Sequence, residues 1–452
     1  MKKLFFILCL NLFSLVSSFA ASDSRHFVFF VHGIAGKPEN FGSLKEILLE
    51  QKKYYSIDED IIVEKFQYNS GDNQADVNKI SLQLSDFIIK KIQEYGGVDE
   101  NDKISFVVHS QGGLITTRLL LRSAMNDSRY HPMLLKNYYS IVTLGTPFWG
   151  SKIAIAGSKV KALARMLGLD ILTFFGNAQL DDLQVTSPAV DELRALLLEP
   201  FAQVLMEKLQ EQIHFVHVAG MPEALKWLRP FVTGKNQFED DTAVPLPSTQ
   251  LDFSYYVENA EHKNKSIIHP EDFFETKFTR EDNFYPVSAF HTSIIKESVK
   301  VHGIAFFPQK CLGYDYVYCP HPALAPVVET LFGLRKTRTP RTDYTSFAFD
   351  LRLRFNGRLL SEKEQSKLKI VLKPLLATTK IGKPGELYKR VRRWDKNGEY
   401  RLYHTGFIKQ VDSYEGLVQM RITLPGYSEK LIQIPVKKGR TTHLDLTLLK
   451  QP

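Results

Sequence analysis

The stretch Phe106-Val-Val-His-Ser-Gln-Gly-Gly113 decides the fold of this 452-residue chain. It closes an apolar segment, and a second apolar run, 114–121, follows the two glycines. The pattern predicts a strand, a sharp turn at Ser110 and a helix. A serine in such a turn is held exposed, and N–H groups at the helix N-terminus stabilise a developing oxyanion. The usual pattern is Gly-x-Ser-x-Gly; Gly112 fits its second glycine, whereas Val108 replaces the first.

Strand-like and helix-like segments alternate on both sides of this turn. The strand candidates are 26–31, 61–66, 104–108, 138–144 and 213–219, and 76–95 carries apolar residues at helical spacing. Such alternation predicts an α/β fold, with a mostly parallel sheet and helices on both faces. A long helical stretch, about 151–212, interrupts the rhythm. We expect it to cap the site; the alternative is a helix buried against the sheet.

Further motifs stand where the expected strands end. They are Val31-His-Gly-Ile34, Leu144-Gly-Thr-Pro-Phe-Trp-Gly150 and Asp241-Thr-Ala-Val-Pro245. His291 follows later, which completes the chain order Ser…Asp…His that this architecture requires. Asp240 is an alternative for the acid, and His269 and His302 are alternatives for the base.

In combination, and together with Leu183-x-x-x-Ser187, these motifs resemble the lipase-like branch of the α/β-hydrolase superfamily. That branch includes bacterial triacylglycerol lipases and GPI-inositol-deacylase-like esterases. The resemblance covers about residues 26–300 and implies a catalytic domain over 21–334. It implies that Ser110 is the nucleophile, Asp241 orients the imidazole, and His291 is general base and then acid. Backbone N–H groups of Ile34 and Gln111 would form the oxyanion hole.

Beyond a linker at about 335–345, the period of the pattern changes. Apolar and polar residues alternate strictly at 347–355, and alternation recurs at 418–424, 432–436 and 444–448. A period of two predicts strands, so we expect a small all-β sandwich over 345–452. The segments 394–398, 425–427 and 438–446 resemble carboxypeptidase-regulatory-like, prealbumin-type sandwiches.

Charge is divided unevenly along the chain. From Arg335 to Pro452, 26 Lys and Arg stand against 11 Asp and Glu, a net +15, while the rest holds 32 against 39, a net −7. A basic residue near an anionic membrane contributes roughly 1 kcal/mol of attraction. We therefore expect the sandwich to bind an anionic membrane or envelope surface. The candidate contacts lie beside Trp394 and are Lys389, Arg390, Arg392 and Arg393. The alternative is a basic domain that is merely soluble.

The N-terminus has the pattern of a signal peptide. Met1-Lys-Lys3 precedes an apolar run, 4–16, and Ser18-Phe-Ala20 offers small residues for cleavage after Ala20. The alternative is an uncleaved anchor, but the run is shorter than the roughly 20 residues that span a bilayer. We expect export to the periplasm or the extracellular space.

Removal of residues 1–20 would take Cys9 away and leave Cys311 and Cys319. A close pair in an oxidising compartment predicts one disulfide. No histidine lies between the two cysteines, no other cluster has metal-ligand spacing, and no glycine-rich phosphate loop is evident. We expect neither a metal nor another cofactor, and no nucleic-acid partner.

These expectations describe an exported serine esterase or lipase that hydrolyses carboxylic esters through an acyl-enzyme. A capped apolar cleft favours lipid acyl chains over sugars or peptides. One alternative is a catalytically inactive hydrolase-fold protein that grips an anionic envelope surface, which Val108 would favour. Another is an acyltransferase, which would pass the acyl group to an acceptor other than water.

Overall fold

The computed structural model describes residues 24–451 with gaps at 35, 71–74, 152–181, 186, 200–203, 205–208, 210, 223–238, 242, 259–264, 292–293, 297–298, 302, 357–358, 377, 382–389, 395–397 and 409–413. The expected signal peptide, 1–20, and most of the expected cap, 151–212, lie outside the described residues. No helix among the described residues is long and apolar enough to cross a membrane.

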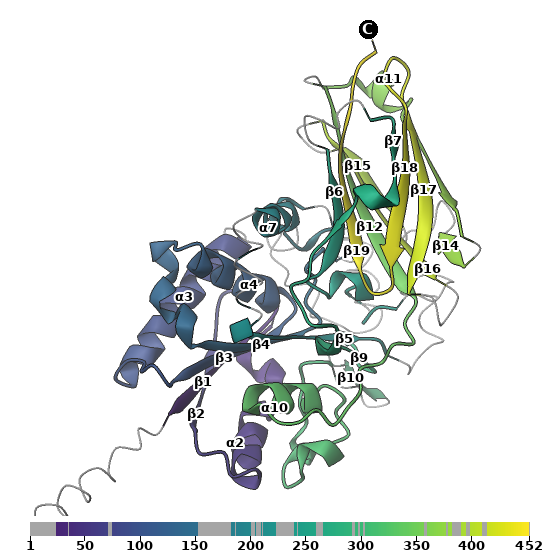
Figure 1. Cartoon of the computed structure of the whole chain (residues 1–452). Helices are drawn as coiled ribbons and strands as arrows, with labels where there is room; N and C mark the ends of the chain where they lie inside the picture. The colour runs from purple at the N-terminus through teal and green to yellow at the C-terminus, as the bar shows by residue number, and fades with distance from the viewer. Residues whose placement is uncertain are drawn as a thin grey trace, which may run out of the picture.

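A six-stranded parallel sheet forms the centre of the N-terminal half (Figure 1). Its strand order is β2-β1-β3-β4-β5-β9, so the order reverses between β1 and β3. In open α/β sheets, ligands bind beyond the carboxyl ends of the strands at such a switch point. The strands are β1 (Arg25–Val31), β2 (Asp60–Phe66), β3 (Lys103–His109), β4 (Tyr138–Leu144), β5 (His214–Gly220) and β9 (Phe284–Val287).

Helices cover both faces of this sheet (Figure 1). Phe27 and Phe29 of β1 face a core shared with α3 (Val77–Glu94), α4 (Gln111–Ala124) and α7 (Pro188–Leu198). Val28 and Phe30 face the opposite core, shared with α2 (Leu44–Tyr54) and α10 (Leu324–Phe332). Because the central strands are buried on both faces, they read as continuous apolar runs. The expected α/β class is confirmed.

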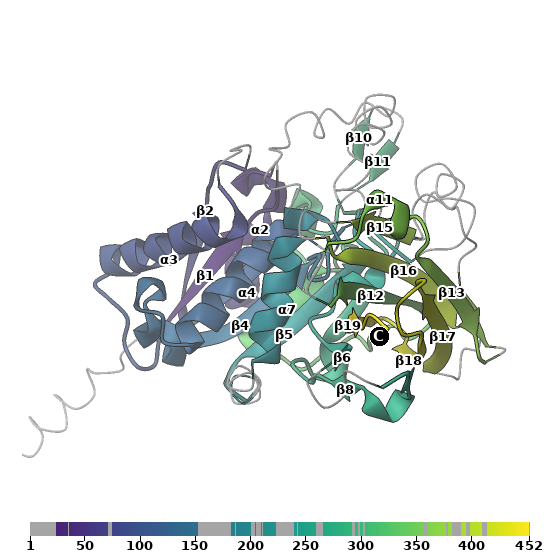
Figure 2. The same cartoon turned by 90° about the horizontal axis from the view of Figure 1, so that it is seen from above.

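The C-terminal half is a β-sandwich (Figure 2). One sheet has the order β14-β16-β12-β19-β6-β8, with β15 pairing with β16, and the other has the order β13-β17-β18-β7. Inner-face residues such as Leu351 and Ile434 share one core. The C-terminal elements are β12 (Ser346–Phe355), α11 (Glu362–Gln365), β13 (Lys369–Pro374), β14 (Thr379–Ile381), β15 (Arg390–Trp394), β16 (Tyr400–Ile408), β17 (Glu415–Thr423), β18 (Lys430–Lys437) and β19 (Thr441–Leu448). A separate hairpin joins β10 (Ile294–Lys296) to β11 (Val299–Val301).

Three strands of the sandwich come from the segment 253–275, which precedes the linker at about 335–345. β6 (Phe253–Val257) pairs in parallel with β19, and β7 (Ile267–Ile268) pairs in parallel with β18. β8 (Phe274–Glu275) pairs antiparallel with β6. All three lie within 21–334, which we expected to be a separate catalytic domain, so the structure differs from that expectation. Local periodicity can identify a strand, but it does not identify the distant strand with which that strand pairs. Because β6 and β7 pair with β19 and β18, shared sheets join the two halves.

Ion pairs also join α7 to the sandwich. The buried Arg194 Nη1 lies 3.3 Å from Oδ2 of Asp350 in β12, and Nη2 lies 3.1 Å from Asp191 Oδ1. Arg401 of β16 pairs with the same Asp191. Removing one member of such a buried pair leaves an uncompensated charge. The position of α7 is therefore fixed by the sandwich as well as by the sheet.

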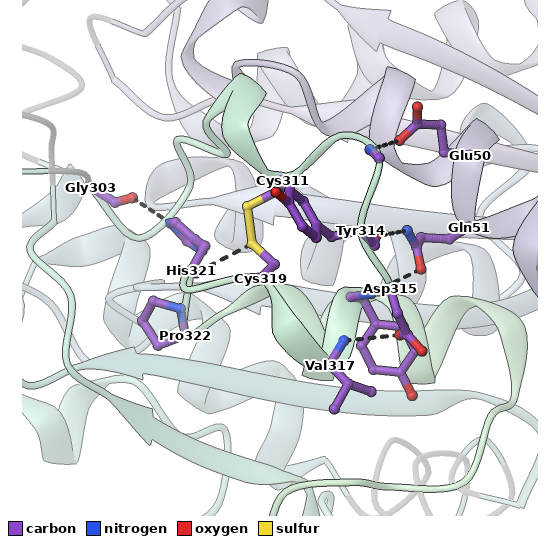
Figure 3. The surroundings of a disulfide bond; sticks show 12 residues. Glu50, Gln51, Gly303, Cys311, Tyr314, Asp315, Val317, Cys319, His321 and Pro322 are labelled. Atoms are coloured by element: carbon purple, nitrogen blue, oxygen red, sulfur yellow. Dashed lines mark hydrogen bonds between the residues drawn. A yellow bond between two sulfur atoms is a disulfide. The ribbon is translucent and has the colours of Figure 1, made fainter.

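A disulfide connects Cys311 to Cys319, the pair expected from the sequence (Figure 3). The enclosed loop is held against α2 by backbone groups. Gln51 donates to the Tyr314 carbonyl at 2.8 Å and accepts from the Tyr316 N–H at 3.0 Å. Glu50 accepts from the Gly313 N–H at 2.8 Å. The disulfide thus closes a loop that hydrogen bonds already hold alongside α2.

Candidate active site

Ser110 sits on a strained turn between β3 and α4. Its φ is 53° and its ψ is −124°, a region that non-glycine residues rarely occupy and that recurs at functional sites. The turn needs glycine at 112, because a Cβ there would lie 2.4 Å from the Val31 carbonyl oxygen. It does not need glycine at 108, because Val108 is fully buried in the core on the α3–α4 side. The close approach of the turn to β1 therefore explains why position 112 is glycine, and it places no such requirement on position 108.

The structure brings Ser110, His291 and Asp241 into one hydrogen-bonded chain. Ser110 Oγ lies 2.9 Å from His291 Nε2, and His291 Nδ1 lies 2.7 Å from Asp241 Oδ2. Asp241 Oδ1 accepts from the N–H groups of Ala243 at 3.0 Å and Val244 at 2.7 Å. A carboxylate so placed fixes the imidazole tautomer, which leaves Nε2 able to accept the serine proton.

The alternative acid and base are placed elsewhere or are not described. His269 caps a short 3₁₀ helix, 270–272, between β7 and β8, where its N–H donates to Asp272. Asp240 forms a bridge with Pro245, next to the residue that contacts the imidazole. His302 lies outside the described residues.

The expected oxyanion donors flank Ser110. Gln111 is the first residue of α4, and Ile34 follows Gly33, where an added Cβ would lie 2.6 Å from Ser110 Cβ. Among the backbone hydrogen bonds of the described turns and loops, none has the N–H of Ile34 or Gln111 as its donor. Two amides available beside a serine hydroxyl are what a tetrahedral oxyanion requires.

Two glycines make room for the acid and the base. A Cβ at Gly145, which has a φ of 61°, would lie 2.8 Å from Asp241 Oδ2 and 3.1 Å from His291 Nδ1. A Cβ at Gly220 would lie 2.4 Å from Asp241 Cβ. Gly145 directly follows β4 and Gly220 is the last residue of β5, so backbone without a side chain faces Asp241 from both strand ends. Gly145 lies within a motif noted in the sequence, but its role beside the acid becomes visible only in the structure.

Buried aromatic and imidazole rings line the site. His109 packs against His291, with ring centroids 4.8 Å apart, and its Nε2 donates to the His291 carbonyl at 3.0 Å. Burial, helped by the charge of a protonated His291, holds the pKa of His109 well below its usual range. His32 stacks on Tyr68 at 4.3 Å, and burial lowers its pKa as well. Both rings stay neutral near pH 7 and act as packing groups.

The motif after β4 supports the loop that carries Asp241. Ser151 Oγ donates to the Ala243 carbonyl at 2.6 Å, and Ser248 Oγ donates to the Gly150 carbonyl at 2.7 Å. Trp149 Nε1 donates to the Gln250 carbonyl at 2.8 Å, while its indole packs against His443 of the sandwich. The motif therefore touches the acid loop and the second half of the molecule together.

No group of three or more metal-ligating side chains occurs among the described residues. In the expected basic contact, Lys389 and the side chains of Arg390, Arg392 and Arg393 lie outside what the structure describes.

A parallel sheet with a serine turn at its switch point defines the α/β-hydrolase fold. Residues 21–195 match the protein family described as "Putative serine esterase (DUF676)". Among solved structures, the chain is similar to phospholipase PlaB from Legionella pneumophila, with a TM-score of 0.63, 14% identity and 94% of each chain covered. The same protein in complex with thio-NAD matches with a TM-score of 0.62 and 14% identity, again over 94% of each chain. No curated protein sequence matches the chain. The resemblance to lipase-like serine esterases is confirmed, and the likeness in fold extends through the sandwich.

Proposed function

We propose that the protein is a serine esterase that hydrolyses carboxylic esters of lipids through an acyl-enzyme. The hydrogen-bonded chain from Ser110 through His291 to Asp241 carries this proposal. The family match and the phospholipase-like fold support an ester substrate, and the likeness to the phospholipase PlaB suggests a lipid.

The mechanism follows from these contacts. His291 Nε2 takes the Ser110 proton as Oγ attacks the ester carbonyl, and Asp241 stabilises the imidazolium. The N–H groups of Ile34 and Gln111 bind the oxyanion. His291 then protonates the leaving alcohol, and Ser110 keeps the acyl group. Water, deprotonated by His291, attacks the acyl-enzyme; the acid leaves and the serine regains its proton.

Labelling with a fluorophosphonate probe tests the nucleophile. The wild type should incorporate one probe and hydrolyse short p-nitrophenyl esters, whereas Ser110→Ala should do neither. Loss of a triad serine lowers turnover by on the order of 10⁶ in a comparable enzyme. Adding His291→Ala to Ser110→Ala should cost almost nothing further, because the two act as a unit. A folded Ser110→Ala variant with several per cent activity would refute the assignment, and an unlabelled, inactive wild type would favour the binding-protein alternative.

We also propose that the sandwich binds an anionic lipid surface. β13, at the edge of its sheet, exposes apolar Val371 between exposed Lys369 and Lys373, and exposed Leu375 and Leu376 follow. The neighbouring residue on β17 is Arg421, also exposed. We call these six residues the β13 surface. Apolar side chains among cations suit a membrane interface.

A charge-reversal pair tests this surface. Lys369→Glu with Lys373→Glu should reduce co-sedimentation with vesicles of phosphatidylglycerol and phosphatidylcholine, and should leave hydrolysis of a soluble ester unchanged. The matched control is Lys79→Glu with Lys90→Glu, which changes the same charge on exposed positions of α3. Salt should weaken wild-type binding, since the screening length falls from about 8 Å at physiological strength to about 3 Å at 1 M. Equal losses in both variants would mean that only net charge matters.

We further propose that the protein is exported after cleavage behind Ala20, on the strength of the N-terminal pattern. N-terminal sequencing of the protein from the periplasm or medium tests this. A cytoplasmic protein that retains Met1 would refute it.

A further inference from the structure

We propose that Glu239 is a positioning residue that ties the loop of the catalytic acid to the sandwich, so that the sandwich completes the active site. The inference rests on the proposed serine-esterase function. It assigns to the C-terminal half a part in catalysis that is separate from membrane binding.

The acid loop, Glu239–Leu246, is closed at its base. The Leu246 N–H donates to the Glu239 carbonyl at 2.9 Å, and Asp240 bridges to Pro245. Asp241 is the residue after Asp240, and its carboxylate accepts hydrogen bonds from the N–H groups of Ala243 and Val244 within the loop. A displacement of the base therefore carries Asp241 with it.

The Glu239 side chain anchors this base to the start of β12 in the sandwich. Its carboxylate accepts from the Thr345 N–H at 2.7 and 2.8 Å, from the Ser346 N–H at 2.8 Å and from the Thr345 hydroxyl at 2.9 Å. Hydrogen bonds to an ionised carboxylate are about twice as strong as neutral ones. Ser346 begins β12, which the sandwich core holds in place. The anchor is thus on rigid structure.

A second contact supports the same loop. Thr441 Oγ1, at the start of β19, donates to the carbonyl of Pro247 at 2.9 Å. Leu246 packs with Tyr344, which precedes β12, and with Ala219 and Met221 at the end of β5. On the hydrolase side, Ser151 holds the Ala243 carbonyl. The loop is held between the two halves, and Glu239 makes the charged connection.

Small displacements of a catalytic acid are costly. A misplacement of about 1 Å can cost about 100-fold in rate, and loss of the acid in comparable triads costs on the order of 10⁴. Weakening the anchor should therefore reduce turnover well short of deleting Asp241.

Glu239→Gln tests the anchor. The glutamine amide has the shape of the glutamate carboxylate but no charge. Its NH₂ group replaces one acceptor oxygen, so a donor would face the N–H groups at the start of β12. We expect kcat on a soluble p-nitrophenyl ester to fall about 10- to 100-fold, with KM within about twofold and fluorophosphonate labelling slowed in parallel. The matched control is Glu275→Gln on β8, which weakens an ion pair with Lys437 of β18 and should leave kcat unchanged.

A double-mutant cycle separates positioning from general stability. In an Asp241→Ala background, Glu239→Gln should lower kcat by less than twofold, because its effect passes through Asp241. Full additivity, or an unchanged kcat in the single variant, would overturn the inference while leaving the esterase function intact. If Glu239→Gln does not fold, Thr345→Val removes one donor and should show the same non-additivity on a smaller scale. A wild type that neither labels nor hydrolyses esters would refute the proposed function itself.

Discussion

Val108 stands two residues before the serine, where the family pattern has glycine, and its side chain is fully buried. Its neighbours in the sheet are Val31 of β1 and Thr143 of β4. Val108→Ala removes two buried methyl groups, so we expect a loss of about 2 kcal/mol in the free energy of unfolding and nearly unchanged kcat. Urea denaturation and ester hydrolysis measure the two effects. A collapse of activity at unchanged stability would show that the turn depends on valine.

The hydrogen-bonded arrangement of Ser110, Asp241 and His291 could be predicted because each lies in a short motif and the chain order of the three residue types is fixed in this fold. Glu239 could not, because its partners, Thr345 and Ser346, are about 100 residues away and carry no motif. The space-making role of Gly220 was hidden for the same reason. A Cβ at position 220 would collide with Asp241, which is 21 positions later in the sequence. Only the folded backbone brings these two residues together.

At the scale of single elements, Asp252 before β6 gives stability a pH dependence. Its carboxylate accepts from the backbone N–H groups of Phe278 and Thr279, and burial raises its pKa to about 6, although Arg440 opposes the shift. Between about pH 4 and pH 6 the unfolded chain loses this proton and the folded chain keeps it, so stability falls as pH rises. Relative to Asp252→Asn, the wild type should lose about 2–3 kcal/mol across that window. Urea titrations at four pH values test this. A difference that does not vary with pH would contradict it.

The disulfide loop is a second element whose contribution can be measured. The Cys311–Cys319 bond closes a short loop that Gln51 and Glu50 also hold, so its loss should lower the unfolding free energy by at most about 3 kcal/mol. Cys311→Ser with Cys319→Ser should keep the kcat of the wild type. Mass measurement after alkylation, with and without reductant, detects the bond. Two free thiols in the exported protein would contradict the pairing.

Individual strands and helices were accessible from periodicity, since an apolar run or an alternating one is a local property. The pairing of β6 with β19 was not, because a five-residue strand such as Phe253–Val257 fits either half. The cap prediction stays untested, as its residues are mostly outside those described.

At the scale of the whole molecule, the shared sheet determines what truncation does. A chain ending at Gly333 would remove β19, the partner of β6, and β18, the partner of β7, and would expose the buried Tyr256 and Ile268. We expect this truncation to be aggregated or inactive even on a soluble ester, contrary to a view of the sandwich as a detachable anchor. Size-exclusion chromatography and fluorophosphonate labelling test it. A soluble truncation that labels at the wild-type rate would show that the halves are independent.

The long-range pairing of β6 with β19 also has a consequence for biosynthesis. Glu258 accepts a hydrogen bond from the Thr447 N–H, 189 residues later, so the last strand of the chain completes a sheet whose first strand, β6, lies before the linker. A ribosome releases the N-terminus first, and the serine turn can form long before Thr345, Ser346 and Thr441 emerge to hold the acid loop. On the proposed mechanism, a nascent chain has its nucleophile but lacks the support of its acid. On the proposed function, full esterase activity would therefore require the completed chain.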